Sequence, residues 1–352
     1  MALSLVRETD GVTRKRALSA AAATLAGTAA LLLGAQRVGA AGDRPSASVD
    51  DGIVDITTNL AYQNAAAAGT GMVLSSSGEV LTNNHVIRGA TTIRATDPST
   101  GRKYSATVVG YDLAADVAVL QLKGASGLQT VSLGDSSKVQ LGDAVTALGN
   151  AGGAGGAPVA ATGTITGLGK SITATDGSSS ERLTGLLETN AGIEPGDSGG
   201  PLVDSNGNVI GMDTAAAAGF ALESGGNDAY AIPINRALAI AKQIVAGHSL
   251  TAHIGATAFL GIEVAAVNDF MGGEAPSGAV VAAVVPASPA ERAGLAYGDV
   301  IVAVNNRKIA SPTTLTALLL KQSPGRKVQI RWIDSFGVSH TARVTLASGP
   351  AQ

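Results

Sequence analysis

The 352-residue chain contains no cysteine, which excludes disulfide bonds, a thiol nucleophile, cysteine-ligated zinc and iron–sulfur clusters. Aromatic residues make up only 3% of the sequence although 45% is hydrophobic, so its cores must be built from Val, Ile, Leu and Ala. The four histidines are scattered over positions 85, 248, 253 and 340 and do not show the spacing of metal ligands. We therefore expect no metal and no other cofactor.

Positive charge is also scarce. The formal net charge is -3 and the isoelectric point is about 5.8, with no Lys/Arg run beyond the first residues of the chain. A protein of this charge lacks the basic surface that nucleic acids require, so nucleic-acid binding is disfavoured. The length exceeds that of a typical single domain and indicates two folded units preceded by a leader.

The first 41 residues are typical of a targeting segment. Basic residues at 7 and 14–16 precede an uncharged apolar stretch over 17–33, and Val38-Gly39-Ala40 resembles a small-residue cleavage site. This pattern predicts a signal peptide over residues 1–41, a polar linker over 42–50, and a protein that is secreted or held in the cell envelope. The apolar stretch is short for a bilayer span, so a retained membrane anchor is the less favoured alternative.

A glycine-rich segment over residues 195–201 carries a candidate nucleophile. It places Ser198 among glycines that let main-chain amides approach a substrate, and such amides stabilise a tetrahedral oxyanion by roughly 3 to 4 kcal/mol each. We predict an oxyanion hole at Gly196, Asp197 and Ser198. The alternative is a glycine-rich turn with an incidental serine.

Two further segments supply the partners that a nucleophilic serine needs. His85 follows the apolar pair Val80-Leu81 at the expected end of a strand, and Asp116 begins the apolar run over 117–122. Serine proteolysis requires a base that takes the hydroxyl proton and a buried carboxylate that orients the base. His85, Asp116 and Ser198 are therefore the predicted triad. Asp112 competes with Asp116, and we assign Asp112 to capping a turn.

In this order, the three segments resemble the HtrA (DegP-like) family of trypsin-fold serine proteases, in particular actinobacterial PepA-like members, over residues 51–348. The resemblance implies a mostly β protein, in which a chymotrypsin/trypsin-like double β-barrel with the triad between its barrels precedes an α+β PDZ domain. It implies a homotrimer as well, and Tyr62 is the only aromatic residue before position 65 that could serve the aromatic contact usual in such trimers. Many family members carry Asn where this chain has Asp197.

The domain limits follow from the resemblance and from local patterns. We predict a protease domain over 51–247, ending in a helix over 234–246, then a linker over 248–254 and a PDZ domain over 255–348 with a helix over 313–321. Small residues dominate 151–157 and 173–180, which we expect to be loops.

The predicted PDZ domain has a candidate peptide site at Leu260, Gly261 and Ile262. Main-chain amides there can hold the terminal carboxylate of a peptide while the neighbouring strand pairs with it. The later landmarks, Ala-Gly-Leu at 293–295 followed by Gly-Asp-Val-Ile at 298–301, belong to the same family pattern. A small β-domain without a ligand is the alternative.

The primary substrate pocket is expected to be apolar. By the family pattern its walls are Ile193 and Ala215-Ala216, and Gly192 stands where an acidic residue would select Lys or Arg. This predicts cleavage after Val, Ile, Ala or Leu. Glu194 is the competing feature, because a carboxylate turned inward would recruit a basic side chain.

Taken together, the sequence predicts an exported serine endopeptidase that hydrolyses unfolded or damaged proteins and binds C-terminal peptides at its PDZ domain. Two alternatives remain at this point. One is a catalytically silent chaperone or scaffold that binds C-terminal peptides, and the other is a ligand-binding protein on a protease fold. Covalent labelling of Ser198 distinguishes the enzyme from both.

Overall fold

The computed structural model describes residues 51–175, 180–214, 229–266 and 277–352. The chain divides into two compact units, residues 1–43 and 44–352, and every described residue belongs to the second. The predicted signal peptide and the linker over 42–50 therefore lie outside the described residues. Within the described ranges, no helix is both long enough and apolar enough to cross a bilayer.

Six antiparallel strands form the first barrel in the order β5-β4-β1-β2-β3-β6, and β5 pairs with β6 to close it. Its core is built almost entirely from aliphatic side chains, as the low aromatic content requires. A short strand from later in the chain, β13 (His253–Ile254), adds to β5. The elements are β1 (Ile53–Leu60), η1 (Ala61–Gln63), β2 (Ala65–Val73), β3 (Glu79–Thr82), α1 (Asn84–Ile87), β4 (Thr92–Thr96), β5 (Lys103–Asp112) and β6 (Val117–Leu122).

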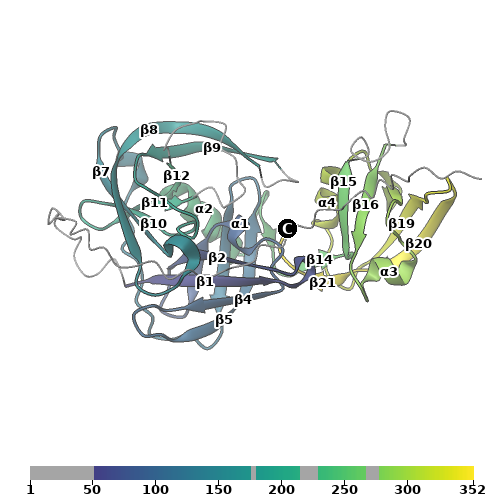
Figure 1. The fold of residues 1–352 in the computed structure, drawn as a ribbon, viewed down its shortest axis with the longest axis horizontal. Coiled ribbons are helices and arrows are strands. Elements are labelled where there is room, and N and C mark those ends of the chain that lie inside the picture. The colour runs from purple at the N-terminus through teal and green to yellow at the C-terminus, as the bar shows by residue number, and fades with distance from the viewer. Residues whose placement is uncertain (1–50, 176–179, 215–228, 267–276) are drawn as a thin grey trace, which may run out of the picture. The chain divides into compact units, whose positions relative to one another are not determined.

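The second barrel is closed by six strands in the order β10-β11-β12-β9-β8-β7 (Figure 1). Its interior is again aliphatic, with Ile165, Leu187 and Leu202 among its buried residues. The elements are η2 (Ser136–Lys138), β7 (Ala144–Gly149), η3 (Ala151–Gly153), β8 (Val159–Thr175), β9 (Ser180–Thr189), β10 (Pro201–Asp204), β11 (Val209–Asp213) and β12 (Ala229–Pro233).

Helix α2 (Ile234–Val245) follows the second barrel and packs against both barrels. Its buried residues, Ile234, Ala237, Ala241 and Ile244, recur every three or four positions and therefore lie on one face of the helix. That face belongs to a hydrophobic cluster containing side chains from both barrels, among them Met72 and Met212. The apolar face of α2 thus packs on a cluster that the two barrels share.

The carboxyl-terminal domain is an α+β unit with its own core around Trp332. Its main sheet has the order β15-β16-β17-β19-β20, with β18 paired to β17, and β14 pairs separately with β21. Both helices begin with a serine whose hydroxyl accepts an N–H of the first turn, followed by proline. The elements are β14 (Thr257–Phe259), β15 (Ile262–Ala266), β16 (Ala279–Val284), α3 (Pro289–Ala293), β17 (Val300–Val304), β18 (Arg307–Lys308), α4 (Pro312–Leu319), β19 (Lys327–Ile333), β20 (Ser339–Thr345) and β21 (Ala347–Gly349).

This architecture confirms the predicted fold class, a mostly β double barrel followed by an α+β domain. Helices α2 and α4 lie within one or two residues of their expected positions. The expected loop over 173–180 is wrong at both ends, because β8 continues to Thr175 and β9 begins at Ser180. A hairpin ladder is held by main-chain hydrogen bonds, so small side chains do not prevent it. The domain boundaries remain predictions.

Candidate active site

His85 and Asp116 form the centre of the candidate site. The Nδ1 atom of His85 lies 2.8 Å from Oδ2 of Asp116, and the main-chain N–H of His85 donates to Oδ1 of the same carboxylate at 2.9 Å. One carboxylate therefore orients both the ring and the backbone of the histidine. A donor at Nδ1 leaves Nε2 as the basic nitrogen, which is the tautomer that a general base needs.

Asp116 is held rigidly behind the histidine. The residue is 2% exposed and adopts a left-handed conformation, with φ of 54°. Its carbonyl accepts from the side-chain amide of Asn83 at 2.9 Å, and its Oδ2 accepts from the hydroxyl of Thr214 at 3.2 Å. Sequence reasoning missed Thr214 because its only local signal is that it follows strand β11. Asp112 accepts from the N–H of Ala115 at 3.1 Å and so caps a turn, as expected.

Ser198 lies in the same cleft as His85. The cleft has a volume of about 300 Å³, and first-barrel residues meet glycine-rich loops of the second barrel there. Its lining residues are Ala66, Ala67, Ala68, His85, Val86, Gly152, Gly153, Pro195, Gly196 and Ser198. The fold therefore brings the predicted nucleophile and the predicted base, which are far apart in sequence, to one concave surface.

Gly196 is the first residue of the candidate oxyanion loop. Its φ of 106° suits glycine, and a Cβ there would lie 2.1 Å from the carbonyl oxygen of Asn150. The Gly196 N–H belongs to the same peptide group as the Pro195 carbonyl. This carbonyl accepts a hydrogen bond from the N–H of Gly152 at 2.8 Å. In a trans peptide the N–H points away from the carbonyl, so this bond fixes the direction of the Gly196 N–H.

The Ser198 N–H is fixed in the same manner. The carbonyl of its peptide, that of Asp197, accepts from the N–H of Gly200 at 2.8 Å. The N–H of Asp197 itself donates to the carbonyl of Glu194 at 3.0 Å, which differs from the sequence prediction of Asp197 as an oxyanion donor. Its amide is used to close the turn, so Gly196 and Ser198 remain the candidate donors.

The Asp197 side chain is buried and lies within Coulombic range of a second buried acid, Asp213. Its Oδ2 accepts from the N–H of Glu194 at 2.9 Å, whereas burial raises the pKa of the carboxyl. Burial, and after it the nearby Asp197, raise the pKa of Asp213 well above its ordinary value. No cation balances either carboxyl group among the described residues. The raised pKa means that the protonated form of Asp213 is favoured relative to an aspartate in water.

The predicted substrate pocket is described only in part. Ile193 is half-buried and packs against the core of the second barrel, and it does not line the cleft that contains Ser198. Ala215 and Ala216 lie outside the described residues. Glu194 is exposed, and only its main chain is tied to the loop. The three alanines at 66–68 give the cleft an apolar wall that sequence reasoning did not identify.

Leu260, Gly261 and Ile262 line one groove of the carboxyl-terminal domain, together with Leu315 and Leu319 of helix α4. The carbonyl of Leu260 accepts from the N–H of Ala290, and that of Gly261 accepts from the N–H of Val285, both at 2.9 Å. These bonds hold the carbonyls of the segment. Most of the side chains that line the groove are aliphatic, and Thr316 and Gln352 add polar groups to its wall, so a peptide with a hydrophobic end is a chemically suitable ligand.

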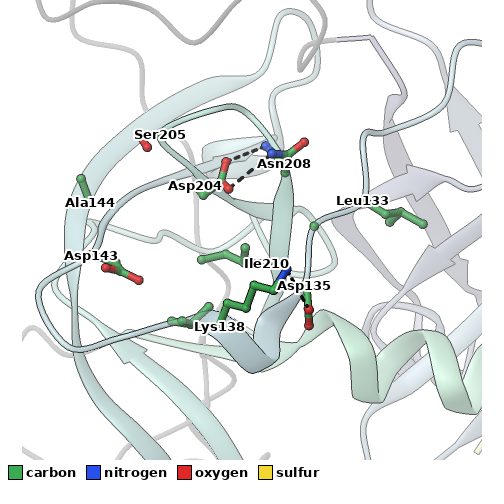
Figure 2. Close-up of a pocket in the computed structure, with 11 residues that line it drawn as sticks. Leu133, Asp135, Lys138, Asp143, Ala144, Asp204, Ser205, Asn208 and Ile210 are labelled. Atoms are coloured by element: carbon green, nitrogen blue, oxygen red, sulfur yellow. Dashed lines mark hydrogen bonds and ion pairs between the residues drawn. The ribbon is translucent and has the colours of Figure 1, made fainter.

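A second cleft, of about 550 Å³, lies on the second barrel (Figure 2). Its acidic side chains serve local turns, since Asp135 accepts from the N–H of Ser137 at 3.1 Å and Asp143 from that of Gln140 at 2.8 Å. Asp204 accepts in the same way from the N–H of Asn208 at 2.9 Å. These carboxylates are explained by structure, and we assign the cleft no function.

Comparison with known proteins finds two family matches along the chain. Residues 69–212 match the family described as trypsin-like peptidase domain, and residues 258–333 match the PDZ domain family. A probable periplasmic serine protease do/HhoA-like of Haemophilus influenzae is 35% identical over 293 residues, which cover 81% of this chain and 59% of the relative. Serine protease PepD of Mycobacterium tuberculosis is 32% identical over 324 residues, which cover 86% and 65%.

Among solved structures, the HtrA-type protease AlgW with tripeptide is 28% identical, with a TM-score of 0.48, and the match covers 87% of this chain and 95% of that one. The chain spans less than two thirds of the length of both curated relatives.

Proposed function

The chain belongs to the HtrA family of serine proteases, and on that premise we propose that it is an exported serine endopeptidase acting on unfolded or damaged proteins. The observation that carries the proposal is the His85–Asp116 pair, joined by two hydrogen bonds, at the wall of the cleft that holds Ser198. Export agrees with the predicted signal peptide and with the periplasmic relative.

Each residue has a defined role in the proposed reaction. His85 Nε2 takes the proton of the Ser198 hydroxyl as its oxygen attacks the substrate carbonyl, and Asp116 stabilises the imidazolium that results. The oxyanion of the tetrahedral intermediate accepts from the N–H groups of Gly196 and Ser198. His85 then gives its proton to the leaving amine, and water repeats the sequence to release the acyl group.

Substrate choice is proposed to favour a small apolar residue before the cleaved bond. The alanines at 66–68 line the cleft, and Ile193 with Ala215-Ala216 remains the predicted pocket. A series of peptides that differ only in this residue measures the preference. We expect kcat/KM to be highest for Val, Ile, Ala or Leu, and a preference for Lys or Arg would contradict the assignment.

The first experiment tests catalysis itself. A fluorophosphonate probe should label the purified chain covalently at Ser198, and Ser198→Ala should abolish the label. His85→Ala should slow labelling strongly, because the hydroxyl loses its base. A chain that is never labelled, with or without added peptide, would instead support the catalytically silent chaperone or scaffold.

We also propose that peptide binding in the carboxyl-terminal groove favours the active arrangement of the protease. A ligand shifts such an equilibrium only through its different affinity for the two arrangements. A peptide with an apolar end should bind at Leu260 to Ile262 through its terminal carboxylate and raise cleavage of an unfolded substrate. Its C-amidated form is the control, and equal stimulation by both forms would rule out carboxylate capture. Assembly as a homotrimer remains a prediction, testable by light scattering.

A further inference from the structure

Thr70 lies where the first barrel meets the candidate oxyanion loop. It belongs to strand β2, it is 0% exposed, and its main-chain N–H donates to the carbonyl of Ser198 at 2.8 Å. Its own carbonyl accepts from the hydroxyl of Thr82 at 2.7 Å. The Thr70 backbone is therefore fixed on one side by its barrel and on the other by the nucleophile.

The Thr70 hydroxyl forms a second link to the loop. It accepts from the N–H of Asn150 at 2.9 Å and donates to the carbonyl of Gly196 at 2.7 Å. Both bonds are buried, and they join residues that are 80 and 126 positions away in sequence. One hydroxyl thus connects the first barrel, the end of strand β7 and the oxyanion loop.

This hydroxyl controls the middle peptide of the loop. The two peptides that carry the proposed donors are each held by an N–H of the main chain, from Gly152 and from Gly200. The peptide between them, from Gly196 to Asp197, has its carbonyl held by the Thr70 side chain. Because this bond comes from a side chain, mutation can remove it without altering the glycines of the loop.

We propose that Thr70 is a positioning residue for the reaction, whose hydroxyl sets the oxyanion hole by fixing the Gly196–Asp197 peptide. The inference rests on the proposed proteolytic function. Without the hydroxyl, this peptide would be held only through the Asp197 N–H, which donates to the carbonyl of Glu194. A shift of the Gly196 Cα, which this peptide shares with the preceding one, would then displace the Gly196 N–H from the developing oxyanion. Binding of the substrate in its ground state would change little, since Thr70 does not line the cleft.

The test compares Thr70→Val with Thr70→Ser in the full chain. Valine keeps the β-branched shape and removes the hydroxyl, whereas serine keeps the hydroxyl. Loss of a whole oxyanion donor lowers kcat by about 10² to 10³. In Thr70→Val the donor would be displaced but still present, so we expect kcat to fall by a smaller factor, roughly 30-fold, with KM within about twofold of the wild type. For Thr70→Ser we expect kcat to stay within about threefold of the wild type.

Thr58→Val is the matched control. Thr58 is a buried threonine of the same barrel whose hydroxyl donates to the carbonyl of Ala67 at 3.3 Å and makes no bond to the loop. The Thr58→Val variant should lose stability while retaining the wild-type kcat. If Thr70→Val does not fold, Thr70→Ala removes the hydroxyl without placing a new methyl group against the Gly196 carbonyl.

Three readouts separate positioning from a general loss of structure. A peptide boronate, whose adduct at Ser198 carries an oxyanion, should bind Thr70→Val more weakly by the same factor as kcat falls. The acid limb of the pH–rate profile should not move, because the His85–Asp116 bonds are untouched. Fluorophosphonate labelling should slow in parallel with kcat.

Two outcomes would overturn the inference, and they are distinguishable. If the wild type labels at Ser198 and Thr70→Val reacts and turns over as fast as Thr58→Val, Thr70 has no positioning role. If the wild type is not labelled at all, the proposed function fails, and the role of Thr70 in it fails as well.

Discussion

The buried acid at Asp213 should make the protease domain less stable as the pH rises. The residue is 0% exposed in β11, and neither carboxyl oxygen has a hydrogen-bond partner within the described ranges. Burial and the neighbouring Asp197 raise the pKa of Asp213, so the folded protein keeps a proton that the unfolded chain releases. We predict that Asp213→Asn, made in the inactive Ser198→Ala background, removes this dependence.

The sign and size of the effect follow from proton linkage. An unfolded aspartate titrates near pH 3.9, and below that value Asp213 is protonated in both states, so its ionisation makes no contribution to the free energy of unfolding. Between that pH and the raised folded pKa, the native state binds more protons, and the free energy of unfolding falls by at most about 1.4 kcal/mol per pH unit. The stability gained by Asp213→Asn should therefore grow by up to about 2.7 kcal/mol from pH 4.5 to 6.5.

Urea unfolding at pH 4.5, 5.5 and 6.5, at constant ionic strength, measures the difference in the free energy of unfolding between the Asp213→Asn variant and its Ser198→Ala background. Trp332 is the only tryptophan and lies in β19, so its fluorescence follows the carboxyl-terminal domain, and circular dichroism is needed for the barrels.

Asp135→Asn is the control for this titration. Hydrogen bonds, first from Ser137 and then from Asn235, lower the pKa of Asp135 to about 2. Asp135 is therefore ionised in the folded and the unfolded protein between pH 4.5 and 6.5, and the effect of Asp135→Asn on the free energy of unfolding should not vary over this pH range. A pH-independent effect of Asp213→Asn, or one that shrinks as pH rises, would refute the reasoning.

The remaining predictions concern turnover, measured with one fluorogenic peptide. His85→Ala and Ser198→Ala should lose activity to similar residual levels, and the double variant should be no worse, because the triad acts as a unit. Asp116→Asn should be severe and Asp112→Asn mild, and the reverse order would show that the carboxylate is misassigned. Gly196→Ala should lose at least about 10² in kcat, because its Cβ cannot fit at φ of 106°, and a calorimetric titration should show unchanged peptide binding in the carboxyl-terminal groove.

The strands of the two barrels could be predicted because they are marked locally, whereas their closure into a double barrel was implied by the resemblance to the HtrA family. Aliphatic runs such as Val117 to Leu122, separated by Gly, Asn and Asp, leave little choice but short strands and turns. The lengths of the strands were less predictable, as the pairing of β8 with β9 shows. A ladder of main-chain hydrogen bonds continues through small residues wherever a partner strand is present. The sequence alone thus indicated which strands exist but not where the longest ones end.

Some residues of the candidate site could likewise be recognised in the sequence, and others could not. Ser198 is recognisable because an oxyanion loop needs glycines next to the nucleophile, and His85 because it follows a strand within a short motif. These requirements act on adjacent residues and are therefore visible in the sequence by itself.

Thr70, Thr214 and Asp213 carry no such signal. A buried threonine hydroxyl looks the same in sequence whether it bonds the neighbouring strand of its hairpin, as Thr58 does, or the oxyanion loop 126 residues away. An aspartate at the end of a strand reveals neither its burial nor the second acid beside it. Only barrel closure brings these partners within hydrogen-bonding or Coulombic range, so their roles were decided by the tertiary structure.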